Sequence, residues 1–324
     1  MRAIFFGTPA IAVPALDALT GIAEVALVIC QPDRPSGRGL ALKAPPVKVR
    51  ATELGIPVVQ PEKIRTPEFA AQLREVNADV GLVIAYGRIL PRAVLEAPRQ
   101  GCLNLHASLL PHYRGAAPIT WVIVRGETET GISLMQMDEG CDTGPVYSRH
   151  RIPIGSAMTA DDLGRELGEL AARVVTSDLV AAVSGALVAE PQDHAAATLA
   201  PMLKKEDGRI DWTRGARAVH DHIRGMTSWP GAFTSIAAGG QQPSKVLKVL
   251  ESRPRAEEAA PTAPGEAAPA APGTVIVASK ASIEVACGSG SVEILRAQVE
   301  GRKPLTAAEL LAGRAIQVGM VLGA

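Results

Sequence analysis

Aromatic residues are scarce in this sequence. Phe, Trp and Tyr together make up 3% of the 324 residues. A broad aromatic platform for stacking the bases of single-stranded nucleic acid is therefore excluded. Hydrophobic residues still make up 47% of the chain, so most of the core volume must come from Ala, Val, Ile and Leu. That fraction, with 20% charged residues, predicts a packed globular protein long enough for two domains.

The sequence also lacks an excess of charge of either sign. Lys and Arg together number 33, and so do Asp and Glu. This balance argues against a protein that coats nucleic acid nonspecifically. It leaves room for a local basic face, because RNA binding follows how charge is distributed over the surface.

Paired cysteines and long apolar stretches are missing as well. The four cysteines form no CxxC pair, and the histidines near them fit no zinc pattern, so we predict no metal site. They read as small buried or half-buried thiols in a reducing compartment. The N-terminus reads as a strand that turns at Gly7-Thr8-Pro9 rather than as a signal peptide, and no stretch is long and apolar enough to span a membrane. We therefore expect a cytoplasmic protein with no membrane partner.

The first half of the chain alternates short apolar runs with helical patterns. Buried strands are predicted at Ile4–Phe6, Val25–Ile29, Val58–Val59, Val80–Ala85 and Cys102–Leu105. Segments such as Pro14–Thr20 and Val47–Leu54 read as helices or turns, and Thr159–Leu187 reads as one long closing helix. This order predicts an α/β fold with a doubly wound, Rossmann-like parallel sheet. No Gly-x-Gly-x-x-Gly follows the first strand, so a dinucleotide site is not predicted.

The second half of the chain has a different sequence pattern. Short strands are predicted at Val246–Leu250, Thr274–Ala278, Ile283–Ala286 and Val292–Leu295, with glycine-rich turns between them. Many short strands of this kind predict a small β-barrel. The run Glu251–Gly273 is dense in Pro, Ala and Glu and reads as a mobile surface insertion between two strands. The predicted domains are 1–189 and 206–324, joined by a linker at 190–205.

The segment from Gly101 to Pro145 carries the residues best suited to chemistry. Asn104 and His106 lie two residues apart where a predicted strand ends, so strand alternation places both side chains on one face. The C-terminal edge of a parallel sheet is where such folds bind ligands. Asp142 follows in a glycine-flanked loop that is able to bring a carboxylate close to His106.

Each of these residues also has an ordinary structural explanation. Alone, His106 reads as a hydrogen-bonded core histidine, Asn104 as a turn cap and Asp142 as an Asx-turn residue. Together, an amide, an imidazole and a carboxylate suit acyl transfer, in which they polarise a carbonyl, handle protons and orient the imidazole. Ser108 lacks the Gly-x-Ser-x-Gly turn of an activated serine. The pattern therefore favours direct transfer to an incoming amine over a covalent acyl-enzyme.

These residues resemble the formyltransferase superfamily that uses 10-formyltetrahydrofolate. The shared pattern is Asn104-x-His106-x-Ser108-Leu109-Leu110-Pro111-x-x-Arg114-Gly115, followed by Gly140-x-Asp142-Thr143-Gly144. Ala116–Ile119 and the loop Gln31–Gly39 are similar to the branch of the family that acts on methionyl-tRNA. The resemblance runs from Phe6–Pro9 to Trp229–Gly231 and so covers nearly the whole chain.

The resemblance implies a site for each substrate. Asn104, His106 and Asp142 match the family's catalytic residues. The folate-contacting turn is matched by Ser108, Leu109, Leu110 and Pro111, and the segment against which the pteridine lies by Ala85, Tyr86, Gly87, Ile89 and Leu90. The formyl donor implied is 10-formyltetrahydrofolate, and no metal is implied.

The resemblance also implies where tRNA binds. The loop at 31–48 matches the family's loop that closes on the acceptor end, with Arg38 at its main basic position. Few basic residues follow Arg38, so contact with tRNA rests on Arg34, Arg38 and Lys43. The pair Lys204 and Lys205 reads either as solvated linker charge or as a further contact. The second domain resembles the family's OB-like, tRNA-holding barrel, and the insertion at 251–273 is a departure that leaves the strand boundaries around it open.

The expected activity is transfer of the formyl group to the free amino group of methionine on initiator tRNA. Asn104 and protonated His106 are expected to stabilise the oxyanion, with His106 oriented by Asp142. Three alternatives stay open: a UDP-amino-sugar formyltransferase, the hydrolase-type domain of a formyl-folate dehydrogenase, and a noncatalytic RNA-binding protein. The Arg38 loop and Ala116–Pro118 favour tRNA, and the intact amide, imidazole and carboxylate argue against a noncatalytic role. We expect a monomer with no obligatory protein partner.

Overall fold

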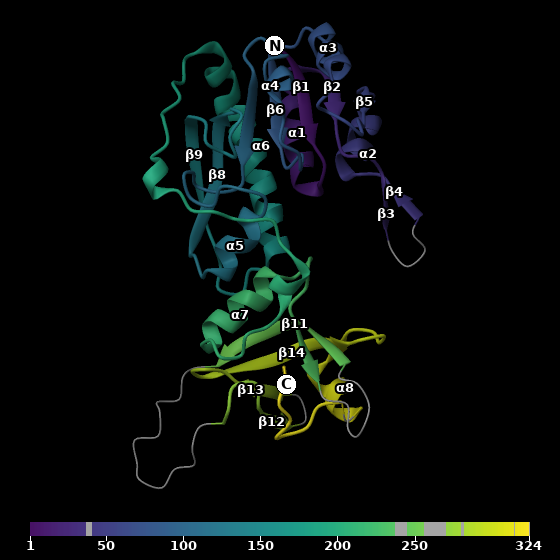
Figure 1. Ribbon diagram of the computed structural model, residues 1–324, viewed down its shortest axis with the longest axis vertical. Coiled ribbons are helices and arrows are strands. Elements are labelled where there is room, and N and C mark those ends of the chain that lie inside the picture. The colour runs from purple at the N-terminus through teal and green to yellow at the C-terminus, as the bar shows by residue number, and fades with distance from the viewer. Residues whose placement is uncertain (37–40, 237–244, 256–269, 280–281, 314, 324) are drawn as a thin grey trace. The chain divides into compact units, whose positions relative to one another are not determined.

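The computed structural model describes residues 1–36, 41–236, 245–255, 270–279, 282–313 and 315–323 (Figure 1). Packing divides the chain into two compact units. Unit 1 comprises Met1–Pro118, Glu129–Pro153 and Asp162–Met202, and unit 2 comprises Ile119–Thr128, Ile154–Asp161 and Leu203–Ala324.

Unit 1 is built on a seven-stranded sheet in the order β5-β2-β1-β6-β7-β8-β9. Its strands are β1 (Arg2–Gly7), β2 (Glu24–Ile29), β5 (Val58–Val59), β6 (Val80–Ile84), β7 (Cys102–His106), β8 (Glu129–Gln136) and β9 (Val146–Pro153). The pairs from β5 to β7 are parallel, which confirms the predicted α/β fold. Strands β8 and β9 add an antiparallel edge, so the sheet is mixed. Neither strand was predicted from the sequence. Strand β9 is half exposed and carries no continuous apolar run, whereas β8 is buried but its apolar residues are interrupted by Thr130, Gly131 and Ser133.

Helices cover the central strands of this sheet on both faces. The helices of unit 1 are α1 (Val13–Thr20), α2 (Pro46–Glu53), α3 (Pro67–Glu75), α4 (Arg92–Leu95) and α6 (Ala160–Ser184). Ile4 and Phe6 pack in one cluster with Phe69 and Leu73 of α3, while Phe5, on the other side of β1, is equally buried. The long closing helix is confirmed as α6. A short hairpin of β3 (Arg34–Ser36) and β4 (Ala41–Lys43) lies outside the sheet.

Unit 2 contains an antiparallel sheet with the strand path β10-β11-β14-β13-β12, and β15 pairs with β14. Its strands are β10 (Phe233–Ile236), β11 (Lys245–Arg255), β12 (Val275–Ser279), β13 (Ser282–Ala286), β14 (Ser291–Val299) and β15 (Leu305–Thr306). Its helices are α5 (Pro118–Val124), α7 (Ala216–Gly225) and α8 (Ala307–Ala312). The predicted β-rich second unit and its four strands are thereby confirmed.

One predicted boundary in unit 2 is wrong. Glu251–Arg255, assigned from composition to the insertion, continue strand β11 and pair with β14. Their charged side chains alternate toward solvent, and Arg255 forms an ion pair with Glu293 at 2.9 Å. A charged, alternating edge of a strand looks like low-complexity sequence when composition alone is considered. Residues 256–269 of the insertion lie outside the described residues, and 270–273 lead into strand β12.

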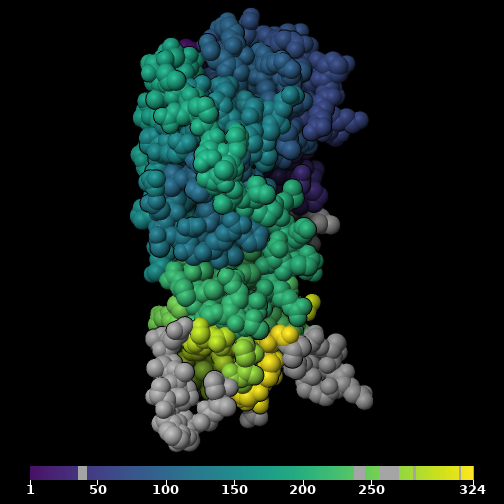
Figure 2. All heavy atoms as spheres, turned by 60° about the vertical axis from the view of Figure 1, so that its left-hand side comes forward, coloured from purple at the N-terminus to yellow at the C-terminus, as the bar shows by residue number. Residues whose placement is uncertain are grey.

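The predicted linker also has a defined place. Glu190–Met202 belongs to unit 1, where Glu190 pairs with Val146 and Leu199 pairs with Arg114 in two isolated bridges. Figure 2 shows this green-teal segment on the surface of unit 1. Most of its side chains are exposed, but Gln192 and Ala200 are buried. The segment is therefore a packed part of the first unit.

Candidate active site

Strand β7 brings Asn104 and His106 to one face of the sheet. Both side chains are buried, with exposed fractions of 8% and 5%, although amide and imidazole groups are costly to bury without partners. Leu105 between them points to the opposite face and is 2% exposed. The alternation predicted for this strand therefore sets two polar groups side by side in a shielded place.

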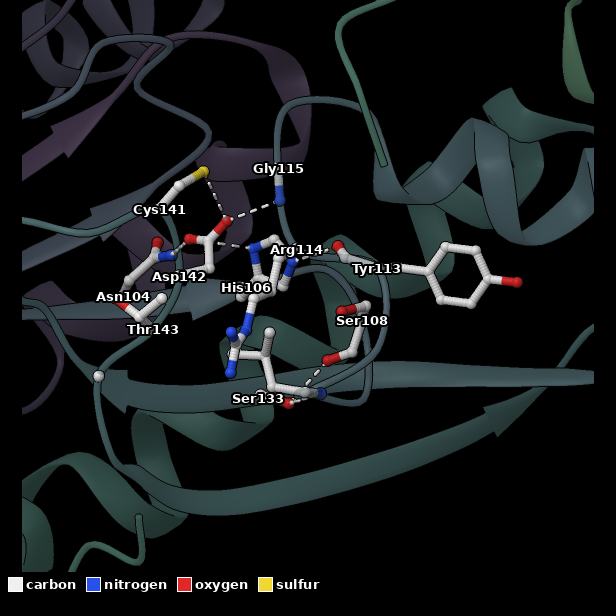
Figure 3. A network of polar contacts seen from close by, with 12 residues as sticks. Asn104, His106, Ser108, Tyr113, Arg114, Gly115, Ser133, Cys141, Asp142 and Thr143 are labelled. Atoms are coloured by element: carbon white, nitrogen blue, oxygen red, sulfur yellow. Dashed lines mark hydrogen bonds and ion pairs between the residues drawn. The ribbon is translucent and has the colours of Figure 1, made fainter. Parts of the chain in front are cut away.

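The loop between β8 and β9 supplies the carboxylate. Strand β8 runs antiparallel to β7 and ends beside Leu103, so the loop folds back toward the middle of β7. Oδ1 of Asp142 lies 3.4 Å from Nδ2 of Asn104 and 3.6 Å from Nδ1 of His106. Figure 3 shows these three side chains pointing toward one another. The structure thus brings together the residues that the sequence singled out, which we call the trio.

A backbone donor fixes the other oxygen of the same carboxylate. The N–H of Gly115 donates to Oδ2 of Asp142 at 2.9 Å (Figure 3). Gly115 has a φ of 121°, a conformation that favours glycine, and a Cβ atom there would lie 2.6 Å from the Ala200 carbonyl oxygen. Glycine is therefore required at this position for the loop to reach Asp142.

His106 faces an oxygen atom on each side of its ring. Nε2 lies 2.9 Å from the carbonyl oxygen of Tyr113, and Nδ1 faces the Asp142 carboxylate. Neither oxygen has a proton to donate, and imidazole offers two N–H groups only in its protonated form. Both ring nitrogens of His106 therefore face oxygen atoms that can accept a hydrogen bond.

The predicted folate turn, Ser108–Pro111, follows β7 directly. Ser108 is fully buried and its hydroxyl donates to the His112 carbonyl at 2.6 Å, so the hydroxyl holds the turn. Ser133 on β8 ties the turn to the sheet: its Oγ accepts from the Leu110 N–H at 3.0 Å and donates to the Ser108 carbonyl at 2.7 Å. Leu110 is buried, whereas Leu109 and Pro111 are half-buried.

The second predicted folate segment, Ala85–Leu90, follows strand β6. Ala85, Gly87 and Ile89 are exposed, while Tyr86 and Leu90 are anchored in the core. Ala85 and Gly87 both have positive φ angles, and a Cβ atom at Gly87 would meet nothing within 4 Å. The segment therefore presents open backbone with little side-chain bulk at the C-terminal end of a parallel strand.

Cys141 is the cysteine closest to the trio in the chain. Its sulfur lies 3.7 Å from Oδ2 of Asp142. Desolvation of the sulfur and, after it, the negative charge of Asp142 raise the pKa of the thiol. The group is therefore an uncharged thiol near neutral pH and not an activated thiolate nucleophile.

The predicted tRNA contacts fall on separate segments. Arg34 and Lys43 are exposed and stand directly opposite each other in the β3–β4 hairpin. Arg38, the residue predicted to matter most, lies outside the described residues. Lys204 and Lys205 are exposed at the start of a short 3-10 helix in unit 2.

Sequence reasoning missed Ser133, Gln192 and the partner role of the Gly115 backbone. Ser133 and Gln192 act through backbone groups of the motif, and no motif spacing connects them with it. Within the described ranges, no three His, Cys, Asp or Glu side chains gather as metal ligands do. Nor does any helix there combine the length and apolarity needed to cross a membrane.

Comparison with known proteins matches both units to one family. The model of the formyl transferase family matches residues 1–179, and that of the formyl transferase C-terminal domain matches residues 202–315. The methionyl-tRNA formyltransferase of Sorangium cellulosum is 67% identical over 323 residues, covering 100% of both chains. That of Geobacter metallireducens is 47% identical and covers 99% of this chain and 98% of its own.

Solved structures share the fold at lower identity. The N-formyltransferase from Helicobacter canadensis, in a complex with folinic acid and dTDP-3-aminofucose, aligns with a TM-score of 0.65 and 17% identity. The alignment covers 90% of this chain and 98% of that one. The methionyl-tRNA formyltransferase from Clostridium thermocellum aligns with a TM-score of 0.53 and 19% identity, covering 79% and 94%.

Proposed function

The chain belongs to the formyl transferase family, and from this we propose that it formylates methionyl-tRNA. The formyl group passes from 10-formyltetrahydrofolate to the free amino group of methionine on the initiator tRNA. The observation that carries the choice of acceptor is the 67% identity with a methionyl-tRNA formyltransferase over the full length of both chains. The amino-sugar enzyme of similar fold is only 17% identical, which supports a shared architecture and not a shared acceptor.

The trio supplies the groups that an acyl transfer needs. Nδ2 of Asn104 and Nδ1 of His106 converge on one negatively charged oxygen, Oδ1 of Asp142. Donors arranged around one anionic oxygen are preorganised to stabilise the negative charge that develops on a formyl oxygen. In our proposal the N–H groups of Asn104 and His106 bind the formyl oxygen when substrate is present. Asp142 keeps its hydrogen bond from Gly115 and orients His106.

The residues around the trio fit a folate. A flat ring system needs open backbone with polar groups at its edges, and Ala85, Gly87 and Ile89 leave the backbone of their segment accessible. The Ser108–Pro111 turn is rigidly held by Ser133 next to His106. We propose that these two segments hold the pteridine and that bound 10-formyltetrahydrofolate supplies an activated formyl group there.

The reaction balances without a nucleophile from the protein. The methionine nitrogen gains a bond to the formyl carbon, the bond from that carbon to N10 of the folate breaks, and one proton passes from the amine to N10. Ser108 donates its hydroxyl to a backbone carbonyl, and Cys141 is an uncharged thiol, so neither is set up to carry the formyl group. The protein's part is to place the groups and to stabilise charge on the formyl oxygen.

The β3–β4 hairpin presents two exposed cations opposite each other. Like charges directly opposite each other destabilise an antiparallel pair, and Arg34 stands opposite Lys43. Neither side chain makes an ion pair with a described residue, whereas the neighbouring Asp33 is bound to Lys48 at 2.8 Å. We propose that these two residues, with Arg38, meet the RNA backbone.

The remaining assignments are proposals of the same kind. We propose that residues 1–189 form the catalytic domain and 206–324 the OB-like, tRNA-holding domain, with Lys204 and Lys205 of the 190–205 segment as further contacts. The protein would act in the cytoplasm as a monomer.

An acceptor comparison tests the proposed function. The purified chain is incubated with 10-formyltetrahydrofolate and, separately, with methionyl initiator tRNA, a UDP-amino sugar, or buffer alone. We expect N-formylmethionyl-tRNA in the first reaction and neither formylated sugar nor free formate in the others. Formylation of the sugar, or release of formate without an acceptor, would assign the chain to one of the alternative activities.

A further inference from the structure

Gln192 lies in the packed segment Glu190–Met202, outside every motif that identified the site. Its side chain is buried, with an exposed fraction of 6%. Nε2 donates to the carbonyl oxygens of Asp142 at 2.9 Å and of Gly144 at 2.7 Å. Its amide therefore bridges the two backbone carbonyls that flank Thr143 in the loop that carries the catalytic carboxylate.

Arg114 fixes which way this amide points. Oε1 of Gln192 accepts from Nε of Arg114 at 3.1 Å and from Nη2 at 2.7 Å. Guanidinium can only donate, so the amide oxygen must face Arg114 and the amide NH₂ must face the loop carbonyls. The amide NH₂ makes two hydrogen bonds and the amide oxygen accepts two. These four bonds hold the amide in one orientation.

The bonds form a closed ring around the carboxylate. Gly115, the residue after Arg114, donates its N–H to the Asp142 carboxylate, and the Asp142 carbonyl accepts from Gln192, which in turn binds Arg114. The ring is anchored from outside, because the Arg114 N–H donates to the Thr198 carbonyl at 2.9 Å and the Arg114 carbonyl accepts from the Ala200 N–H at 2.7 Å. Glu190 likewise exchanges two backbone bonds with Val146.

Asp142 needs such support because its backbone is strained. Its φ is 54°, in the left-handed region that non-glycine residues rarely occupy. Residues in this conformation persist where the surrounding structure over-determines them. The amide of Gln192 binds the carbonyl of that very residue, and the same residue's carboxylate faces His106.

We propose that Gln192 is a positioning residue for formyl transfer, which holds the backbone of Asp142 so that its carboxylate meets Asn104 and His106. This role rests on the proposed function, since it concerns the same site. It acts on placement of the trio and not on either substrate, so it predicts an effect on kcat with little effect on KM for folate. A displacement of about 1 Å in a catalytic group is enough to cost about a hundredfold in rate.

The test compares Gln192→Met and Gln192→Glu with the wild-type chain. Met keeps the volume and loses every hydrogen bond, whereas Glu keeps the shape and the bond to Arg114 but loses both donors to the loop. We expect kcat to fall about tenfold to a hundredfold in both variants, with KM for folate changed by less than about threefold. Circular dichroism and thermal unfolding report whether each variant is folded, and the Glu variant carries the test if the Met variant is not.

Gln136→Met is the matched control. Nε2 of Gln136 also donates to two backbone carbonyls, of Gln100 and Cys102, and Oε1 accepts from Tyr147, yet none of these residues belongs to the trio. Gln136→Met removes the same kind of hydrogen bonds away from the trio, so we expect its kcat to stay near the wild-type value.

A double-mutant cycle with Asp142→Asn adds a measurement that a merely structural role would not move. Gln192→Met should cost less than about twofold in that background.

Three results would overturn the positioning role: wild-type kcat in folded Gln192→Met, full recovery of kcat in Gln192→Glu, or losses that multiply in the double mutant. Failure of the proposed function is distinct, because the wild-type chain would then transfer no formyl group in the same assay.

Discussion

His106 presents its Nδ1 atom to Oδ1 of Asp142 across 3.6 Å, and the two side chains are only 6% and 16% exposed. The distance exceeds that of a good hydrogen bond, so Nδ1 is not committed to the carboxylate and can meet a substrate oxygen. The pair therefore combines a fixed orientation with a ring nitrogen that is free to contact a substrate.

Loss of any member of the trio should lower turnover without unfolding the protein. We expect Asn104→Ala, His106→Ala and Asp142→Ala each to lose about a hundredfold or more in kcat, the scale of removing one preorganised polar group. Steady-state kinetics beside thermal unfolding make the comparison. A well-folded His106→Ala protein with near-normal turnover would remove the basis of the mechanism.

Ser133→Ala should weaken folate binding and stability together. The change leaves the buried Leu110 N–H and Ser108 carbonyl without their partner, which costs about 1–3 kcal/mol for an unsatisfied buried group. Binding of a folate analogue by calorimetry and the free energy of unfolding in urea measure the two effects. The matched control is Thr130→Val on the same strand, because the buried Thr130 hydroxyl has no hydrogen-bond partner among the described residues. If both variants behave alike, Ser133 does not hold the folate turn.

Cys141 should be dispensable and slow to alkylate. We expect Cys141→Ala to keep turnover near the wild-type value, since no covalent step uses the thiol. Desolvation and, after it, the Asp142 carboxylate raise the pKa of this thiol, so Asp142→Asn should lower the pKa and speed alkylation by iodoacetamide at a fixed pH. Mass spectrometry locates the adduct, because Cys30, Cys102 and Cys287 are buried. An alkylation rate that Asp142→Asn leaves unchanged would contradict this electrostatic coupling.

The basic hairpin should matter for tRNA and not for folate. Arg34→Ala and Lys43→Ala are expected to lower kcat/KM for methionyl-tRNA, and each should reduce the slope of log affinity against log salt by about 1. Arg38→Ala should behave in the same way, and lysine at that position should rescue only partly because it lacks the planar fork. Arg173→Ala, an exposed change on α6, serves as the control. An unchanged salt slope in all three hairpin variants would leave tRNA binding to other surfaces.

The parallel part of the sheet and the common face of Asn104 and His106 were predictable because their signals are local. The approach of Asp142 to these two residues was expected only from the family resemblance, since it depends on a loop 38 residues away in sequence. Apolar runs mark strands buried on both faces, and the spacing of Asn104 and His106 fixes their common face. Strand β9 escaped prediction because it alternates charged and half-buried residues at an edge. Gln192 was not predicted for another reason. Its side chain binds the backbone carbonyl of Asp142, fifty residues away in sequence, and every residue has a backbone carbonyl, so this contact produces no sequence pattern. Composition assigned Glu251–Arg255 to the insertion, but these residues form a strand because they pair with β14.

The central claim is direct transfer of a formyl group from folate to methionyl-tRNA by the trio, and rapid-quench analysis of a labelled formyl group tests it most directly. Excess enzyme is mixed with 10-formyltetrahydrofolate labelled in the formyl carbon and with methionyl initiator tRNA, and the label is followed on folate, protein and tRNA. We expect label to leave folate and to appear on methionyl-tRNA at the same rate, with none bound to protein, and we expect His106→Ala to slow both changes equally. Label that accumulates on the protein before it reaches tRNA, or that leaves as formate, would contradict the central claim.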